Sequence, residues 1–68
     1  MKAADIKDIA ERQPFRPFTV RLTNGAQYTF NEPRNLGAPR DYRVIFFFGD
    51  SEWAMLDSEN IAEVIQRQ

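Results

Sequence analysis

The chain lacks two residue types on which many functional sites depend. Among its 68 residues there is no cysteine and no histidine. Without cysteine, a disulfide framework and a thiolate metal site are excluded. Without histidine, the usual general base and the commonest metal ligand are missing. We therefore expect no metal site and no cofactor, and we expect that the protein is not an enzyme.

Long hydrophobic runs and a surplus of one charge are also missing. The longest apolar run covers residues 44–48, far short of the ~20 residues that a membrane-spanning helix needs. An acidic segment follows Lys2 where a signal peptide would be apolar, so a cytoplasmic location is the default. Nine Lys and Arg balance ten Asp and Glu, which excludes a simple polybasic nucleic-acid arm.

What is present is an ordinary globular composition on a short chain. Hydrophobic residues make up 43% of the sequence and aromatic residues 13%. A single domain of this size, residues 1–68, rarely buries enough apolar surface to exceed its conformational entropy by much. Because disulfides and a zinc site are excluded, oligomerisation is the remaining remedy. A well-packed monomer is the alternative, and composition alone leaves both open.

The spacing of apolar residues predicts a short helix over residues 5–13. Asp5 is the expected N-cap. Pro14 is the expected stop, because the residue before a proline is pushed out of the α region. A helix this short is marginal alone, so its apolar face must dock on the rest of the chain. That face consists of Ala3, Ile6, Ile9 and Ala10.

From residue 18 the apolar residues alternate, which predicts strands over 18–23 and 26–31. Parity decides the turn between them. A two-residue loop at Asn24 and Gly25 would put the two apolar sets on opposite faces, whereas a three-residue loop beginning at Thr23 puts them on one face. We therefore predict a type I turn with a G1 bulge and Gly25 in the left-handed region.

A loop containing Pro and Gly leads to two further strands, predicted over 42–48 and 52–56. In the first, even-numbered and odd-numbered residues occupy opposite faces. Because both sets are apolar, this strand is expected to be covered on both faces. In the second, Trp53 and Met55 share one face.

The last segment, residues 61–65, fits two patterns. Ile61, Val64 and Ile65 have helical spacing, and the local residue propensities lean to a helix. Ile61, Glu63 and Ile65 also alternate as in a short strand.

This order of elements resembles the Sm/LSm-like fold, which includes the bacterial RNA chaperone Hfq. The stretch Phe18–Gly25 after a short helix and the ending Asn60–Ile65 carry the resemblance. Residues 14–18, followed by Val20, Leu22 and Gly25, also resemble a group of small bacterial proteins with a PFRPF-x-V-x-L-x-[DN]-G motif. The resemblance implies a mainly β (α+β) fold, with a short N-terminal helix and a strongly bent five-stranded antiparallel sheet or barrel whose last strand is 61–65.

In that family the fourth strand of one subunit pairs with the fifth strand of its neighbour and closes a ring. The resemblance therefore implies a non-enzymatic homo-oligomeric binding module, with RNA as the ligand class. The loops at 31–35 and 57–60 do not match the family's RNA-binding loops, and the second is acidic. The fold thus carries over and the RNA-binding residues do not. The alternative function is a protein–protein interaction or assembly module without nucleic-acid binding.

Two sets of candidate site residues follow. Planar guanidinium groups and a stacking ring suit nucleic acid, and these candidates are Arg16, Arg34, Arg40, Arg43 and Tyr42. We favour the alternative that the arginines pair with Glu32 and Asp41 of the same loop. Aromatic residues on strands are expected to pack in a core or interface, with Trp53 as the interface anchor. The predicted interface residues are Trp53, Met55, Leu56, Ile61, Val64, Ile65 and Phe47.

Charge is divided unevenly along the chain. Residues 1–43 hold eight basic and five acidic residues, net +3, whereas residues 44–68 hold one basic and five acidic, net -4. Head-to-tail complementarity between subunits would explain this division. We favour the alternative that these are solvated surface charges whose uneven distribution has no function, because the charges are few. The acidic pairs Asp50 with Glu52 and Asp57 with Glu59 lie in polar turns, where solvated carboxylates are expected and not general acid–base groups.

Overall fold

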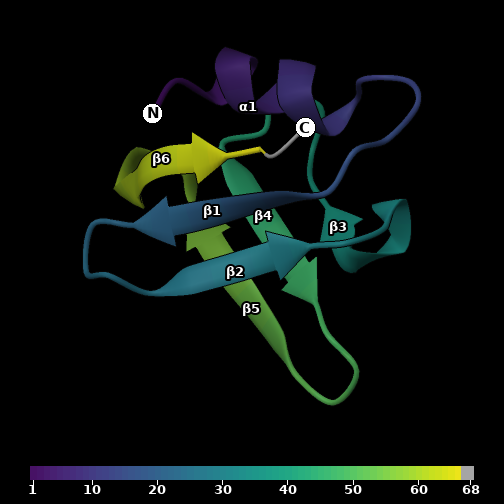
Figure 1. Cartoon of the computed structure of the whole chain (residues 1–68). Helices are drawn as coiled ribbons and strands as arrows, with labels where there is room; N and C mark the ends of the chain where they lie inside the picture. The colour runs from purple at the N-terminus through teal and green to yellow at the C-terminus, as the bar shows by residue number, and fades with distance from the viewer. Residues whose placement is uncertain (67–68) are drawn as a thin grey trace.

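One helix and six strands in two small sheets make up the structure (Figure 1). The computed structural model describes residues 1–66. Sheet A has the strand order β2-β1-β6 and sheet B the order β3-β4-β5, with antiparallel neighbours throughout. In chain order the elements are α1 (Ala3–Ala10), β1 (Phe18–Leu22), β2 (Gln27–Phe30), the 3-10 turn η1 (Pro33–Asn35), β3 (Leu36–Gly37), β4 (Val44–Phe48), β5 (Trp53–Asp57), the 3-10 turn η2 (Ser58–Asn60) and β6 (Ile61–Ile65).

Helix α1 begins two residues before the predicted range and ends at Ala10. Lys2 is the N-cap, and its carbonyl accepts hydrogen bonds from the N–H groups of Asp5 and Ile6. Asp5, the predicted cap, instead lies in the first turn, where its charge suits the helix dipole. Ile6 and Ala10 are buried, so the apolar stripe docks on the sheets as predicted.

The register of the β1–β2 hairpin is the predicted one. Phe18 lies opposite Phe30, and Val20 lies opposite Tyr28. The large apolar residues of both strands therefore point to one face, and the rings of Phe18 and Phe30 stack at 5.0 Å between centroids. Burial of this face determines the register, because a slip of one residue would turn the whole set to solvent.

The turn of this hairpin is also as predicted. The N–H of Gly25 donates to the carbonyl of Leu22, and the N–H of Leu22 donates to the carbonyl of Ala26. The Asn24 side chain accepts a hydrogen bond from the N–H of Ala26. Gly25 has a φ of 92°, a left-handed conformation that a residue without Cβ adopts at little cost.

Residues 61–65 form strand β6, not a helix. Arg21 lies opposite Glu63 and Val20 opposite Val64, and the Arg21 guanidinium forms an ion pair with the Glu63 carboxylate. Helix propensity is worth only a few tenths of a kcal/mol per residue. Pairing with β1 satisfies the backbone groups along the second edge of that strand, so tertiary pairing outweighs the local preference.

The predicted alternation in β4 is present, but the chain covers only one of its two faces. Ile45 is 1% exposed and Phe47 packs against the core, whereas Phe48 on the opposite face is 43% exposed. The two sheets contact each other through one face each. In residues 1–66 no third layer lies over the other face of sheet B, so the expectation of cover on both faces is wrong for the chain by itself.

Strand β4 begins at Val44, two residues later than predicted. The N–H of Tyr42 donates to the carbonyl of Pro39, and the Asp41 carboxylate accepts from the N–H of Arg43. These bonds form a tight turn in which Tyr42 has a φ of 55°. A left-handed residue cannot continue a strand, which explains the later start.

The predicted five-stranded barrel is wrong. The described chain has six strands in two three-stranded sheets that do not close into a barrel. The extra strand, β3, pairs with Phe46 and Phe47 of β4. Turn η1 separates it from β2: Pro33 has no N–H for a ladder, and Asn35 Oδ1 accepts hydrogen bonds from two backbone N–H groups before the turn.

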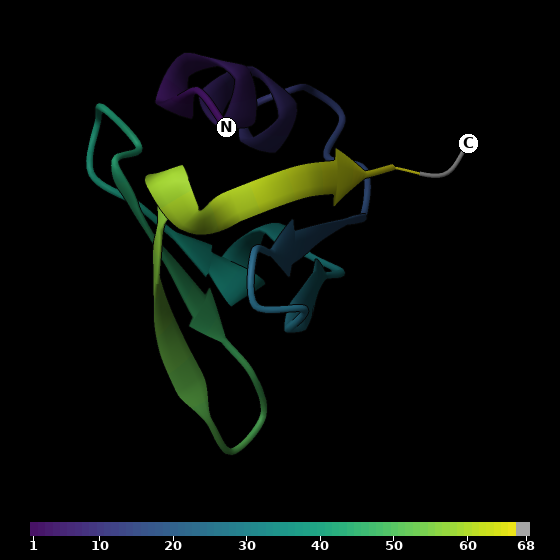
Figure 2. The ribbon, with the colours of Figure 1, turned by 90° about the vertical axis from the view of Figure 1, so that its left-hand side faces the viewer.

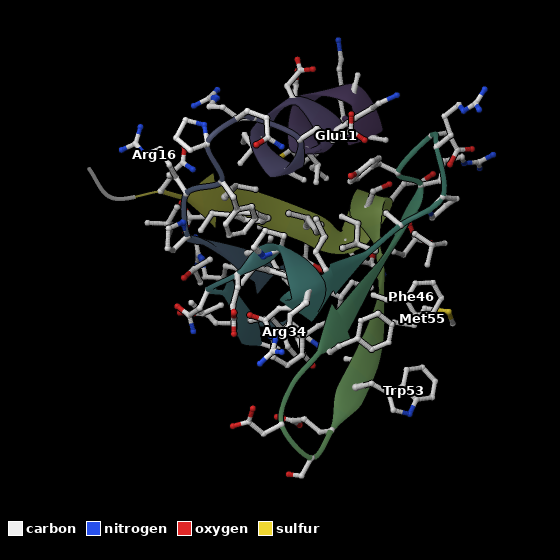
Figure 3. The ribbon with its side chains drawn as sticks, turned by 90° about the vertical axis from the view of Figure 1, so that its right-hand side faces the viewer. Glu11, Arg16, Arg34, Phe46, Trp53 and Met55 are labelled. Atoms are coloured by element: carbon white, nitrogen blue, oxygen red, sulfur yellow. The ribbon has the colours of Figure 1, made fainter. Side chains whose placement is uncertain are left out.

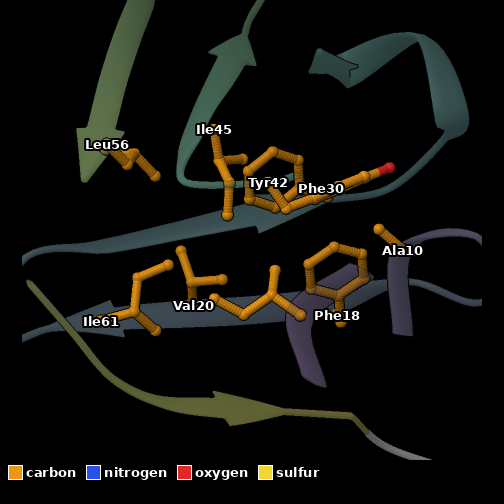
Figure 4. Close-up of a cluster of buried hydrophobic side chains, with 9 residues drawn as sticks. Ala10, Phe18, Val20, Phe30, Tyr42, Ile45, Leu56 and Ile61 are labelled. Carbon is orange, nitrogen blue, oxygen red and sulfur yellow. The ribbon is translucent and has the colours of Figure 1, made fainter. Parts of the chain in front are cut away.

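The core lies between the two sheets and beneath α1 (Figures 2 and 4). The Phe30 ring contacts Phe47 edge-on across the sheets, at 5.4 Å between centroids. The β4–β5 hairpin extends beyond this core on the side away from α1 (Figure 2). The buried hydrophobic residues are Ile6, Ala10, Phe18, Val20, Phe30, Tyr42, Ile45, Leu56 and Ile61. No helix in residues 1–66 is long and apolar enough to cross a membrane.

Candidate functional site

The most unusual surface of the molecule is the outer face of sheet B. Residues directly opposite each other in an antiparallel pair point to the same face. Phe46 lies opposite Met55, and Phe48 lies opposite Trp53. Val44 shares this face by alternation along β4. We call these five residues the outer aromatic face: Val44, Phe46, Phe48, Trp53 and Met55.

The side chains of the outer aromatic face point away from the core. Figure 3 shows Phe46, Met55 and Trp53 projecting from the β4–β5 hairpin on the side that faces away from the core. The Phe46 ring lies 6.1 Å from that of Phe48 and 6.4 Å from that of Trp53, with interplanar angles of 8° and 29°. The rings therefore form a row with similar orientations.

The outer aromatic face is exposed to an extent that is uncommon for such residues. Trp53 is 66% exposed, Met55 63% and Phe48 43%. If a fully exposed side chain of this size presents about 200 Å², these three together expose roughly 350 Å². The largest contiguous apolar patch on a typical monomer is about 300–600 Å² and is often functional, so this face is a candidate for the patch that binds.

Gly37 of β3 allows the Phe48 ring to lie close to the sheet. A Cβ atom at this position would come within 2.8 Å of Phe48 Cε2. The Asn35 side chain also donates to the Phe48 carbonyl at 2.9 Å. The connection from β2 to β3 thus holds one border of the outer aromatic face.

The structure divides the predicted interface residues into three groups. Trp53 and Met55 are exposed on sheet B, and Ile65 is 39% exposed on sheet A. Phe47 and Val64 are partly buried against the core. Leu56 and Ile61 are 3% and 2% exposed, so their side chains belong to the core and are not available to a partner. Alternation along β5 explains this, because Leu56 points to the face opposite Trp53 and Met55.

Phe46 and Phe48 were absent from the predicted interface set. Their exposure depends on which face of β4 meets sheet A, and both faces of that strand are apolar. The sequence nevertheless contains the information, because the short turn after Phe48 places this residue opposite Trp53. If Trp53 and Met55 are exposed on β5, the residues opposite them on β4 share their face and are expected to be exposed as well.

The predicted nucleic-acid residues do not gather on one surface. Arg16 precedes β1, whereas Arg34 lies in η1, and Figure 3 shows them well apart. The Arg34 guanidinium lies 3.5 Å from the Glu32 carboxylate, which is the pairing that we favoured for it. Arg40 and Arg43 are exposed in the turn before β4.

Tyr42, the predicted stacking residue, is a core residue. It is 7% exposed, so its ring offers no free face to a base. Burial raises the pKa of the Tyr42 hydroxyl, and the Glu11 carboxylate, which accepts its hydrogen bond, raises it further. Tyr42 thereby connects the turn before β4 to the end of α1.

The paired carboxylates lie at the two ends of β5. Asp50, Glu52, Asp57 and Glu59 are all exposed. In the part of the chain that the structure describes, no group of three or more His, Cys, Asp or Glu residues is arranged to hold a metal ion. Asp57 Oδ1 accepts a hydrogen bond from the N–H of Glu59, which gives this carboxylate a structural role in η2.

Geometry therefore identifies the outer aromatic face, and not a cleft with reactive groups, as the candidate site. No protein-family model, curated protein or solved structure matches this chain.

Proposed function

We propose that this protein is a non-enzymatic assembly module whose copies join edge to edge, strand β5 of one copy against strand β6 of the next. The observation that carries the proposal is the position of these strands. Each is an edge strand of its sheet, and Trp53, which is 66% exposed, lies on β5. Unpaired strand edges are templates for pairing with another chain.

The free edge of β5 presents backbone donors. The N–H of Gly49 donates to the carbonyl of Glu52, and the N–H of Ser58 donates to the carbonyl of Arg43, at the two ends of the β4–β5 ladder. Because hydrogen-bonded and non-hydrogen-bonded pairs alternate between these ends, the N–H groups of Trp53, Met55 and Asp57 point away from β4. They are available to a strand added at this edge.

One further feature supports joining between unlike edges. The Sm/LSm-like resemblance implies pairing of the fourth strand with the neighbour's fifth, and β5 and β6 are the fourth and fifth strands when the two-residue β3 is set aside. Repeated head-to-tail contacts close into a ring when the rotation between copies allows it.

Light scattering with two substitutions at one position tests the proposal. Met55→Pro removes an outward N–H without removing a β4–β5 hydrogen bond, whereas the control Met55→Thr keeps the N–H. We expect a mass of several chains for the wild type and Met55→Thr, and a mass near 8.0 kDa for Met55→Pro. Circular dichroism confirms that each variant is folded. A wild-type mass of one chain at every concentration would contradict the proposal.

RNA binding, the ligand class that the resemblance implies, has less support. The candidate arginines are dispersed, and the charged residues of β5 and of the turns on either side of it are acidic. Anisotropy of a labelled short RNA tests it directly. Binding that weakens steeply with salt would restore this function.

A further inference from the structure

We propose that the outer aromatic face is a docking surface for a segment of a partner protein that presents apolar side chains followed at one end by Lys or Arg. The face extends beyond the β5 edge used in self-assembly: Trp53 and Met55 lie on β5, whereas Phe46 and Phe48 lie on β4, one strand away from that edge. The inference therefore goes beyond the proposed function and does not depend on it.

The exposed apolar area of the face is the first feature that suits a partner segment. Its side chains form a continuous row over two strands, and their exposed area of roughly 350 Å² is contiguous. A stable interface between folded proteins buries about 800 Å² on each partner. An area of less than half this size suits a short segment better than a folded domain.

Charge is the second such feature. Every charged residue among residues 44–66 is acidic. Asp57 lies on the face itself, opposite Val44 at the end away from the hairpin turn. Glu52 alternates with Trp53 and therefore points to the inner side, where it lines a hollow together with Asp50 and Phe47.

The end near Asp57 also contains a shallow hollow. Its charged lining consists of Asp41, Asp57, Glu59 and one basic residue, Arg43. The N–H of Arg43 donates to the Asp41 carboxylate. Carboxylates thus outnumber cations at this end, so a partner gains from apolar contact along the face and from Lys or Arg beside Asp57.

The same charges disfavour a second copy as the occupant. Two outer aromatic faces packed against each other would bring carboxylates of both copies into the same rim, and like charges across an interface are costly. The apolar area from two copies would also remain at the small end of stable interfaces. A basic segment avoids the repulsion between carboxylates, and a short segment does not need the area that an interface between two folded proteins requires.

Trp53 is the only tryptophan of the chain and reports on the face directly. The probe is a synthetic amphipathic peptide of Leu and Lys with its Leu residues on one face, and the matched peptide replaces every Lys by Glu. We expect the Lys peptide to shift Trp53 emission to shorter wavelength with saturation. We expect binding of the Glu peptide to be at least tenfold weaker.

Matched substitutions locate the binding. Phe48→Ser should weaken binding of the Lys peptide about tenfold. Ile65→Ser, on the outer face of sheet A, is the control, because Ile65 has nearly the same exposed fraction, 39% against 43%. Asp57→Asn combined with Glu59→Gln, both at the hollow beside the face, should also weaken binding, more at low salt than at high salt.

Three results would overturn the inference. The Lys peptide could leave Trp53 emission unchanged, or Ile65→Ser could weaken binding as much as Phe48→Ser. The third is a lower oligomer mass for Phe48→Ser, which would mean that a second copy covers the face. Edge pairing is tested at Met55 by mass, whereas peptide docking is tested at Phe48 by emission, so the two proposals fail separately.

Discussion

The outer faces of the two sheets present side chains of opposite character to solvent: those of sheet A are mostly polar, and those of sheet B are mostly apolar. On sheet A, the hydroxyls of Thr19 and Thr29 are hydrogen-bonded at 2.9 Å, and Arg21 pairs with Glu63. On sheet B, the corresponding positions carry the outer aromatic face. Both sheets have apolar inner faces, so the difference lies only in what each turns to solvent.

This difference teaches how a continuous apolar run is to be interpreted in a small domain. Strand β1 alternates apolar and polar residues, which is typical of a sheet with one solvated face. Strand β4 is apolar at every position, yet only one of its faces is covered by the chain. A continuous apolar run in a small domain therefore does not mean that the chain itself covers both faces of the strand.

The largest expected effect separates the inner and outer faces of β4. Ile45→Ala removes a side chain that is 1% exposed and should lower the free energy of unfolding by about 2–5 kcal/mol. Phe48→Ser, three residues along the same strand, should lower it by about 1 kcal/mol or less. Urea unfolding measures both. Equal losses would mean that both faces of β4 are buried in solution.

A turn substitution tests the order of sheet A. Gly25→Val should cost about 1–3 kcal/mol, because a β-branched residue is strained at a φ of 92°. No atom lies within 4 Å of the added Cβ, so the cost arises from the backbone alone. Gly25→Asn, which tolerates this conformation better, should cost less. An equal cost for the two would contradict the turn.

The contact between the turn before β4 and the end of α1 has a pH dependence of its own. The pKa of Tyr42 is raised in the folded protein, so this residue contributes stability that is full below its unfolded pKa of about 10. That contribution is lost as the pH rises through the folded pKa. Urea unfolding between about pH 9 and about pH 11 should show a smaller loss of stability in Tyr42→Phe than in the wild type. Parallel curves would contradict the burial of Tyr42.

The smallest effect concerns the polar pair on sheet A. Arg21 and Glu63 have side chains that are 45% and 44% exposed, so water screens their interaction. A double-mutant cycle with Arg21→Ala and Glu63→Ala should give a coupling of about 0.2–1 kcal/mol that decreases with salt. A larger coupling without salt dependence would mean that sheet A has a covered outer face like the one proposed for sheet B.

Local signals predicted the hairpin and the helix face well. Phe18 and Phe30 can share one face of the hairpin only if the turn has three residues, and Gly25 is the residue that can adopt the left-handed conformation of that turn. The start of α1 was missed because Lys2, which has no capping side chain, precedes it. The helical preference of residues 61–65 was misleading because pairing with β1 is a long-range interaction.

Two features of the candidate site could not be predicted from local patterns. Tyr42 resembled a strand residue with an available ring, but the turn around Asp41 directs it into the core. Leu56 and Trp53 belong to one strand, and only the packing of sheet A on sheet B decides which of them is exposed. Sequence periodicity determines that two faces exist, not which one meets the core.

By itself, the sequence determined the elements that depend on neighbours along the chain: a short amphipathic helix, a hairpin with a defined register, and strands that alternate. The tertiary structure decided that residues 61–65 are a strand, that the strands form two sheets, and that the aromatic side of β4 and β5 is exposed. The physical reason is that alternation and turn geometry are local properties of the backbone. Burial, in contrast, depends on which surfaces distant segments present to each other.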